Sequence, residues 1–181
     1  MKWLLRAVLG LVVLIALVLG VGLLLPSAFK VERSVTIAAA PDVVYPLIAA
    51  PKEWARWSVW NRRDPNMQIT YGGPSSGNGA RWSWDSKTEG KGAMRFTEGT
   101  APERISYELS FPEFGMTSTG RLLLTPVDVG GKPGTRVSWS NEGDMGGNPL
   151  NRWFGLFMDR LVGPDFEAGL ANLKQLAETG S

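Results

Sequence analysis

The chain of 181 residues contains no cysteine and no histidine. Without cysteine it forms no disulfide, and it offers no thiol nucleophile and no thiolate ligand for a metal. Without histidine it has no imidazole base and no imidazole ligand, which excludes a Ser-His-Asp triad and a histidine-bound zinc site. The side chains that remain form no recognisable catalytic motif. We therefore expect no cofactor, no metal and no catalytic residues, and we favour a non-enzymatic role.

Long basic runs are also missing, although the formal net charge of the chain is +2. Lys2, Arg6 and Lys30 precede residue 31, whereas all 17 acidic residues follow it. The chain from residue 31 onward therefore carries 16 basic and 17 acidic residues, a net charge of −1. This balance provides no basic surface that could follow nucleic-acid phosphates, so we exclude nucleic acid as a partner.

Polar side chains are absent from residues 7–25, which read AVLGLVVLIALVLGVGLLL. A helix of this length measures about 28 Å, close to the ~30 Å hydrocarbon core of a bilayer. Pro26 follows and ends the helix, because proline has no N–H to donate. The run predicts a single-pass membrane anchor, with the membrane as a partner.

Two other interpretations of this segment stay open. A cleaved signal peptide would use Lys2 and Arg6 as its charged region, but its apolar part normally spans ~7–15 residues. A buried helix of a soluble protein is the other. For an anchor, Lys30 and Arg33 beyond the run nearly balance the basic residues before it, so the positive-inside bias is slight. It favours a cytoplasmic N-terminus and an exported C-terminal domain.

The rest of the chain is long enough for one domain with its own core. We assign residues 1–30 to the anchor and a short linker, and residues 31–181 to the domain. The predicted elements are a strand over residues 31–37, short helices over 41–48 and 51–57, a loop over 61–66, and about six strands between residues 68 and 141. Residues 143–147 are glycine-rich and are predicted to form a turn.

The last third of the chain is predicted to be helical. Asn148 and Pro149 match a helix cap followed by proline at the first helical position. Gly163 and Pro164 are expected to kink or break the helix. The apolar stripe beyond this point consists of Phe166, Leu170, Leu173 and Ala177.

Strands joined by short turns favour an antiparallel meander, and the long helix can cover its apolar face. The fold class is therefore α+β, a helix-grip architecture with a curved antiparallel sheet wrapped on a long C-terminal helix and an N-terminal transmembrane helix.

Four segments resemble the START-like superfamily, in particular its polyketide cyclase/dehydrase and lipid-transport group (SRPBCC). They are residues 35–45 (VTIAAAPDVVY), 54–58 (WARWS), 124–139 (with LTP and GTRVSW) and 165–174 (DFEAGLANLK). The resemblance implies a deep apolar cavity between sheet and C-terminal helix, which binds lipids, sterols, polyketides or other apolar ligands. A minority of members catalyse cyclisation or dehydration, and no catalytic motif is common to them.

Alternation along the strands predicts which side chains face the interior. It directs Tyr107 inward and Glu108 outward, and the same phase directs Arg81, Asp85 and Arg95 to solvent. Asn141 is either an inward polar group or the cap of a strand end. The predicted cavity wall consists of Trp82, Tyr107, Phe111, Met116, Trp139, Phe157 and Met158. The eight tryptophans fill the core, line the cavity or contact the membrane surface.

The leading hypothesis is a membrane-anchored, non-catalytic protein that binds a hydrophobic small molecule or lipid. The first alternative is an enzyme like the polyketide cyclases and dehydratases, which would use Tyr107 or a buried carboxylate. The second is an interaction module whose cavity is vestigial and filled by side chains.

Overall fold

The structure is a computed structural model that describes residues 2–180. Its helices are α1 (Lys2–Leu24), α2 (Pro41–Ala49), α3 (Pro51–Trp57), α4 (Val59–Arg63), the 3-10 helix η1 (Pro112–Phe114), α5 (Pro149–Gly155) and α6 (Met158–Thr179). Its strands are β1 (Ala28–Ile37), β2 (Gln68–Gly72), β3 (Arg81–Ser86), β4 (Gly90–Thr100), β5 (Arg104–Phe111), β6 (Met116–Val129) and β7 (Lys132–Asp144).

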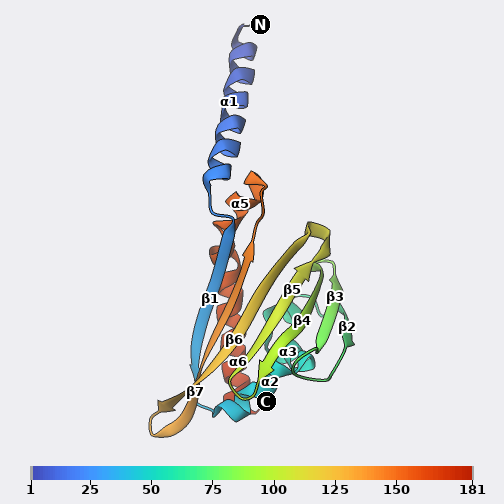
Figure 1. Cartoon of the computed structure of the whole chain (residues 1–181), viewed down its shortest axis with the longest axis vertical. Helices are drawn as coiled ribbons and strands as arrows, with labels where there is room; N and C mark the ends of the chain where they lie inside the picture. Colours follow the sequence, from blue (N-terminus) through green and yellow to red (C-terminus); the bar gives the residue numbers. More distant parts are fainter. Residues whose placement is uncertain (1, 181) are drawn as a thin grey trace.

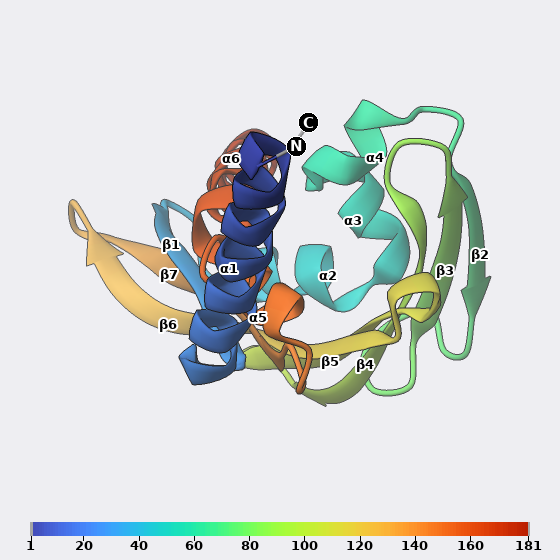
Figure 2. The same cartoon turned by 90° about the horizontal axis from the view of Figure 1, so that it is seen from above.

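The seven strands form one antiparallel sheet in the order β1-β7-β6-β5-β4-β3-β2. From β2 to β7 each strand pairs with the next one in sequence, and β1 closes the far edge against β7. Figure 2 shows the sheet curving around α2, α3 and α6. This arrangement confirms the predicted α+β helix-grip fold.

Helix α6 is the long helix that covers the sheet. Its buried face includes Phe166, Leu170 and Leu173, as the apolar stripe predicted. Of the predicted kink or break at Gly163 and Pro164, the break is wrong, because α6 runs through both residues. The chain breaks earlier, between the end of α5 and the start of α6.

Arg33 of β1 connects the turns of α6 on either side of its proline. The Arg33 guanidinium lies against Gly163, where any Cβ would overlap it. It also pairs with Asp159, at 2.7 Å, and with Glu167, at 2.6 Å. Asp159 precedes Pro164 and Glu167 follows it. Through Arg33, strand β1 is therefore bonded to α6 on both sides of the proline.

Three local expectations need correction. Residues 59–63 form α4 within the region predicted partly as loop, and β1 begins at Ala28 rather than residue 31. β7 extends to Asp144, into the predicted turn, because Gly143 pairs with Phe29 of β1 on one side and Ser118 of β6 on the other.

Aromatic rings lie over glycines of neighbouring strands at several points in the sheet. Trp84 covers Gly92 and Phe29 covers Gly143, and a Cβ added at either glycine would overlap the ring. Glycine has no side chain there to stand in the way, so a large ring can lie flat along the sheet. The inner face is consequently lined by aromatic rings, which sets the shape of the interior.

Most of helix α1 projects beyond the domain (Figure 1). Gly22 is buried, whereas the other residues of its described span are not. By length and composition α1 could cross a membrane, with a mean hydropathy of 3.0, and a signal sequence near the N-terminus shares these properties. Anchoring in a membrane therefore stays a prediction at this point.

Candidate functional site

A cavity of about 220 Å³ lies between the inner face of the sheet and helices α3, α4 and α6. An engineered cavity of roughly 150 Å³ already holds a benzene ring, so this volume suffices for a small apolar molecule or part of a larger one. Apolar side chains form most of the wall, which includes Phe29, Trp54, Trp60, Trp82, Trp84, Met94, Leu109, Met158, Val162 and Phe166.

The cavity approaches the surface near the connection between β5 and β6. Phe111 and Met116 are half-buried there and Thr117 is exposed, whereas Tyr107 and Trp139 at the inner end are 2% and 1% exposed. Figure 1 shows this connection at the same end of the domain as α1 and α5. The mouth of the cavity therefore faces the end of the domain from which α1 projects.

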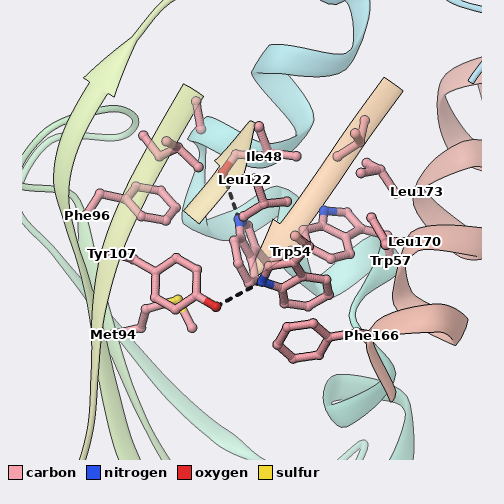
Figure 3. Packing of buried hydrophobic residues seen from close by; sticks show 14 of the residues in the cluster. Ile48, Trp54, Trp57, Met94, Phe96, Tyr107, Leu122, Phe166, Leu170 and Leu173 are labelled. Atoms are coloured by element: carbon pink, nitrogen blue, oxygen red, sulfur yellow. Dashed lines mark hydrogen bonds between the residues drawn. The ribbon is translucent and has the colours of Figure 1, made fainter. Parts of the chain in front are cut away.

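The inner end is built of interlocking aromatic rings. Trp139 stacks on Phe166 with ring centroids 4.0 Å apart, and Trp54 meets Trp139 edge to face at 5.6 Å. Figure 3 shows Tyr107 facing Trp54, Trp57 and Phe166 across this cluster. The Trp54 and Trp57 indole N–H groups donate to carbonyls of α2, at 2.8 and 3.0 Å. These bonds satisfy both indoles and fix the rings in place.

Tyr107 reaches across a neighbouring strand because Gly120 has no side chain. Tyr107 of β5 pairs with Gly120 of β6, and Gly120 pairs with Asn141 of β7. The Tyr107 ring lies over Gly120, and a Cβ there would overlap it. The phenol oxygen can then accept a hydrogen bond of 2.8 Å from the Trp139 indole N–H. One missing side chain thus brings a phenol, an indole and an amide together.

Asn141 provides an unpaired polar group at this point. Its side chain lines the cavity and is 7% exposed. Within residues 2–180 its Nδ2 makes no hydrogen bond of normal length, although the amide lies near enough to the Tyr107 phenol to lower the pKa of that group. A buried donor without a partner is costly to the fold, so its position in a cavity wall points to a partner supplied from outside the chain.

Burial raises the pKa of the Tyr107 phenol to about 12, while Trp139 and Asn141 act in the opposite direction. Because this value exceeds the ordinary 10.0, the folded chain binds the phenolic proton more tightly than the unfolded chain. The resulting stabilisation is complete below pH 10 and is lost as the pH rises toward 12.

We expect the stability advantage of the wild type over Tyr107→Phe to shrink by about 2 kcal/mol between pH 10 and pH 12. Urea unfolding of both proteins across this pH range measures the difference in their free energies of unfolding. Other groups titrate equally in the two proteins, so their contributions cancel in this difference. An advantage that stays constant with pH would show that the phenol is not sequestered.

Ionisable groups are scarce along the wall. Glu89 lines the cavity, and its carboxylate lies 3.8 Å from the Arg63 guanidinium. The other polar lining residues are the neutral Ser58, Asn61, Tyr107, Thr117, Ser118 and Asn141. Among residues 2–180, no three acidic side chains gather as a metal site would require. The arrangement is suited to holding a mostly apolar molecule through shape and a few neutral polar contacts.

Six of the seven residues predicted for the wall line this cavity: Trp82, Tyr107, Phe111, Met116, Trp139 and Met158. Phe157 does not, and its side chain is 48% exposed. Its assignment assumed one continuous helix, but α5 ends at Gly155 and Phe157 precedes the first residue of α6. The helical phase is therefore reset, and the side chain lies at the surface. Whether the six bind a ligand stays a prediction.

Strand alternation gave the correct direction for the charged residues. Arg81, Asp85, Arg95 and Glu108 are exposed. Asn141 is buried, so of its two predicted roles the inward polar group is the correct one. Phe29 was missed because it fell within the predicted linker. Met94 could have been found, because it alternates with outward Arg95 on its strand.

The comparisons with known proteins agree with this geometry. The family model described as polyketide cyclase / dehydrase and lipid transport matches residues 28–178. The chain belongs to this family. No curated protein matches its sequence significantly. The START-like resemblance stated above is thus confirmed at the level of the polyketide cyclase/dehydrase family.

Solved structures place this family member among proteins of the same fold. Truncated norcoclaurine synthase from Thalictrum flavum has a TM-score of 0.63 and 11% identity, covering 85% of this chain and 96% of the synthase. A protein of unknown function from Staphylococcus aureus also has a TM-score of 0.63 and 11% identity, over 86% of this chain and 96% of its own. An HSP90 activator from Plasmodium falciparum has a TM-score of 0.57 and 17% identity, over 82% and 95%. At these identities the likeness shows the fold alone.

Proposed function

We propose that the protein is a membrane-anchored, non-catalytic binding protein for an apolar small molecule or lipid. The observation that carries this proposal is the aromatic-walled cavity with one buried, unpaired amide in its wall. Small-molecule sites are typically concave and apolar, with a few placed polar groups. The description of the family, which includes lipid transport, supports an apolar ligand.

Helix α1 is the proposed anchor, with residues 1–30 as anchor and linker and residues 31–181 as the binding domain. Its apolar surface is exposed along nearly its whole length, as expected of a helix in contact with lipid. The N-terminus would be cytoplasmic and the domain exported. Tethering would raise the local concentration of lipid-derived ligands at the cavity.

The polar groups of the cavity favour a ligand with a neutral hydrogen-bond acceptor, such as a ketone, an ester or an amide. Asn141 offers an unpaired N–H donor, and the wall described above includes neither lysine nor arginine. A carboxylate would lose its hydration without meeting a cation, and it would also meet Glu89. We therefore propose neutral ligands over free fatty acids.

Two features support binding over catalysis. The raised pKa of Tyr107, about 12, keeps the phenol protonated at neutral pH, so it is a poor general base. Glu89, the acidic side chain along the wall, is paired with Arg63. Among the described residues, the inner part of the wall therefore offers a cyclase-like enzyme no carboxylate, lysine or arginine. The cavity volume argues against a vestigial interior filled by side chains.

Replacing Asn141 with leucine should stabilise the ligand-free protein and weaken binding of carbonyl-bearing ligands. Removing a buried, unpaired donor is expected to raise the free energy of unfolding by about 1 kcal/mol. Loss of the hydrogen bond should weaken binding of an apolar ketone about tenfold, while a hydrocarbon of the same size should bind as before. Urea unfolding and ligand titration measure the two effects, and equal weakening for both ligands would contradict the assigned role.

The proposal itself is tested by titrating the full chain, freed of lipid and held in mild detergent, with apolar probes. Neutral polyprenyl esters and fatty acids of matched length form the ligand pair. Because Trp54 and Trp139 lie at the cavity, a bound ligand should change the intrinsic tryptophan fluorescence. Saturable changes with the neutral probe support the proposal. The absence of any saturable response to either probe would overturn it.

A further inference from the structure

An apolar surface at the start of the C-terminal helices has no partner among the described residues. It consists of the exposed side chains Leu150, Phe154, Leu156, Phe157 and Leu161, each 48–56% exposed. We refer to these five residues as the α5 surface. Single exposed apolar residues are common, but a cluster that includes two phenylalanines marks an interaction site.

Helix α5 lies directly against the C-terminal part of α1. The Trp153 indole N–H donates to the Val18 carbonyl at 2.9 Å, and Arg152 donates to the Leu23 carbonyl at 2.7 Å. Gly22 permits this approach, because a Cβ there would lie 2.7 Å from the Pro149 carbonyl oxygen. Figure 1 shows α5 beside the lower end of α1.

These contacts fix the depth of α5 relative to the proposed membrane span. Val18 lies six residues before Leu24, the last residue of α1. At 1.5 Å per residue, Trp153 meets α1 about 9 Å inside its C-terminal end. If residues 7–25 fill the hydrocarbon core of a bilayer, this level lies about 9 Å below the boundary between the headgroups and the acyl chains.

We infer that the α5 surface is immersed in the lipid interface beside α1, so that the domain rests on the membrane rather than hanging from a flexible tether. This inference rests on the proposed membrane anchor. It commits to the bilayer as the occupant because the surface continues directly from the lipid-facing side of α1. Apolar faces of interfacial helices enter the headgroup boundary by ~5–10 Å, which matches the depth set by Trp153.

The composition of α5 fits this location. The Trp153 ring is apolar apart from its indole N–H, and the Val18 carbonyl satisfies that N–H. Arg152 bonds to the carbonyls of Leu23 and Leu25 and to Gly146, so its charge is held against the end of α1 and away from the apolar side chains. The remaining exposed side chains of the α5 surface are free to contact acyl chains.

The cavity wall adjoins the α5 surface. Met158 follows Phe157 and lines the cavity, and Phe111 and Met116 line it near its mouth. Lipid around the α5 surface would therefore lie next to the cavity entrance. An apolar ligand could then pass between bilayer and cavity without crossing bulk water.

Single cysteines test this inference cleanly, because the natural chain contains none. Phe154→Cys and Leu161→Cys report on the α5 surface, and Leu14→Cys reports on the middle of α1. Val43→Cys is the matched control, since Val43 is also a helical apolar residue, is 51% exposed, and lies in α2 at the opposite end of the domain. Each full-length variant carries a polarity-sensitive fluorophore and is reconstituted in phosphatidylcholine vesicles with or without nitroxide-labelled lipid.

The expected result is loss of fluorescence by lipid nitroxides at residues 14, 154 and 161, and none at residue 43. Quenching at residue 14 but not at 154 or 161 would overturn the interfacial placement while leaving the anchor intact. No quenching at residue 14 would overturn the anchor and this inference together. Energy transfer between labels at residue 154 of separate chains, without lipid quenching, would assign the surface to self-association and would also overturn the inference.

Discussion

Replacing Met116 with tryptophan is expected to weaken binding of apolar ligands more than tenfold while leaving the domain folded. Met116 lines the cavity near its mouth and is only half-buried, so a larger ring can enter the empty volume without displacing the core. If the indole excludes roughly 60 Å² of ligand surface, binding loses about 1.5 kcal/mol, or more than tenfold in affinity. Titration with a neutral apolar probe measures the loss.

The matched control for this variant is Leu123→Trp. Leu123 lies on the same strand, β6, but its side chain is 42% exposed on the outer face. This substitution should leave both affinity and the thermal midpoint close to those of the wild type. If Met116→Trp binds the probe as tightly as Leu123→Trp does, the cavity is not the binding site.

A valine at position 120 should cost more stability than its strand propensity would suggest. Valine is favoured over glycine in strands, yet its side chain would occupy the space of the Tyr107 ring. The ring would have to leave, breaking its hydrogen bond with Trp139. We expect a loss of about 3 kcal/mol or more in the free energy of unfolding, measured by urea denaturation in mild detergent.

The control is a double-mutant cycle, which measures how the effects of substitutions at positions 120 and 107 on the free energy of unfolding depend on each other. Tyr107→Ala destabilises the protein by removing a buried ring, but Gly120→Val combined with Tyr107→Ala should be less destabilised than the sum of the single changes. Thr119→Val, at the neighbouring exposed position of β6, should have little effect. Additive effects of Gly120→Val and Tyr107→Ala would contradict the account of the ring lying over the glycine.

Much of the fold was predictable because it depends on local patterns. Alternation placed Tyr107 inward and Glu108 outward, and the stripe from Phe166 to Leu173 predicted the covering helix. Proline caused one of the errors. Pro164 suggested a break in the last helix, but Arg33, distant in sequence, holds the turns around it through two carboxylates.

The site was only partly predictable for a related physical reason. The two-residue repeat of a strand indicates which face of the sheet a side chain occupies, so it correctly predicted that Trp82 and Trp139 line the cavity. It could not show that Gly120 opens a path for Tyr107, since that depends on which strands pair and in which register. Nor could it find the contact between Trp153 and α1, which joins residues 135 positions apart.

The most direct test of the central claim is mass spectrometry of the ligand held by the full chain after purification in lipid nanodiscs. Annular lipid surrounds any membrane helix, so the comparison is between the wild type, Met116→Trp and Leu123→Trp. We predict a neutral apolar molecule, one per chain, with the wild type and with Leu123→Trp, and a much smaller amount of it with Met116→Trp. The same lipid composition in all three preparations would contradict the claim that the cavity binds an apolar ligand.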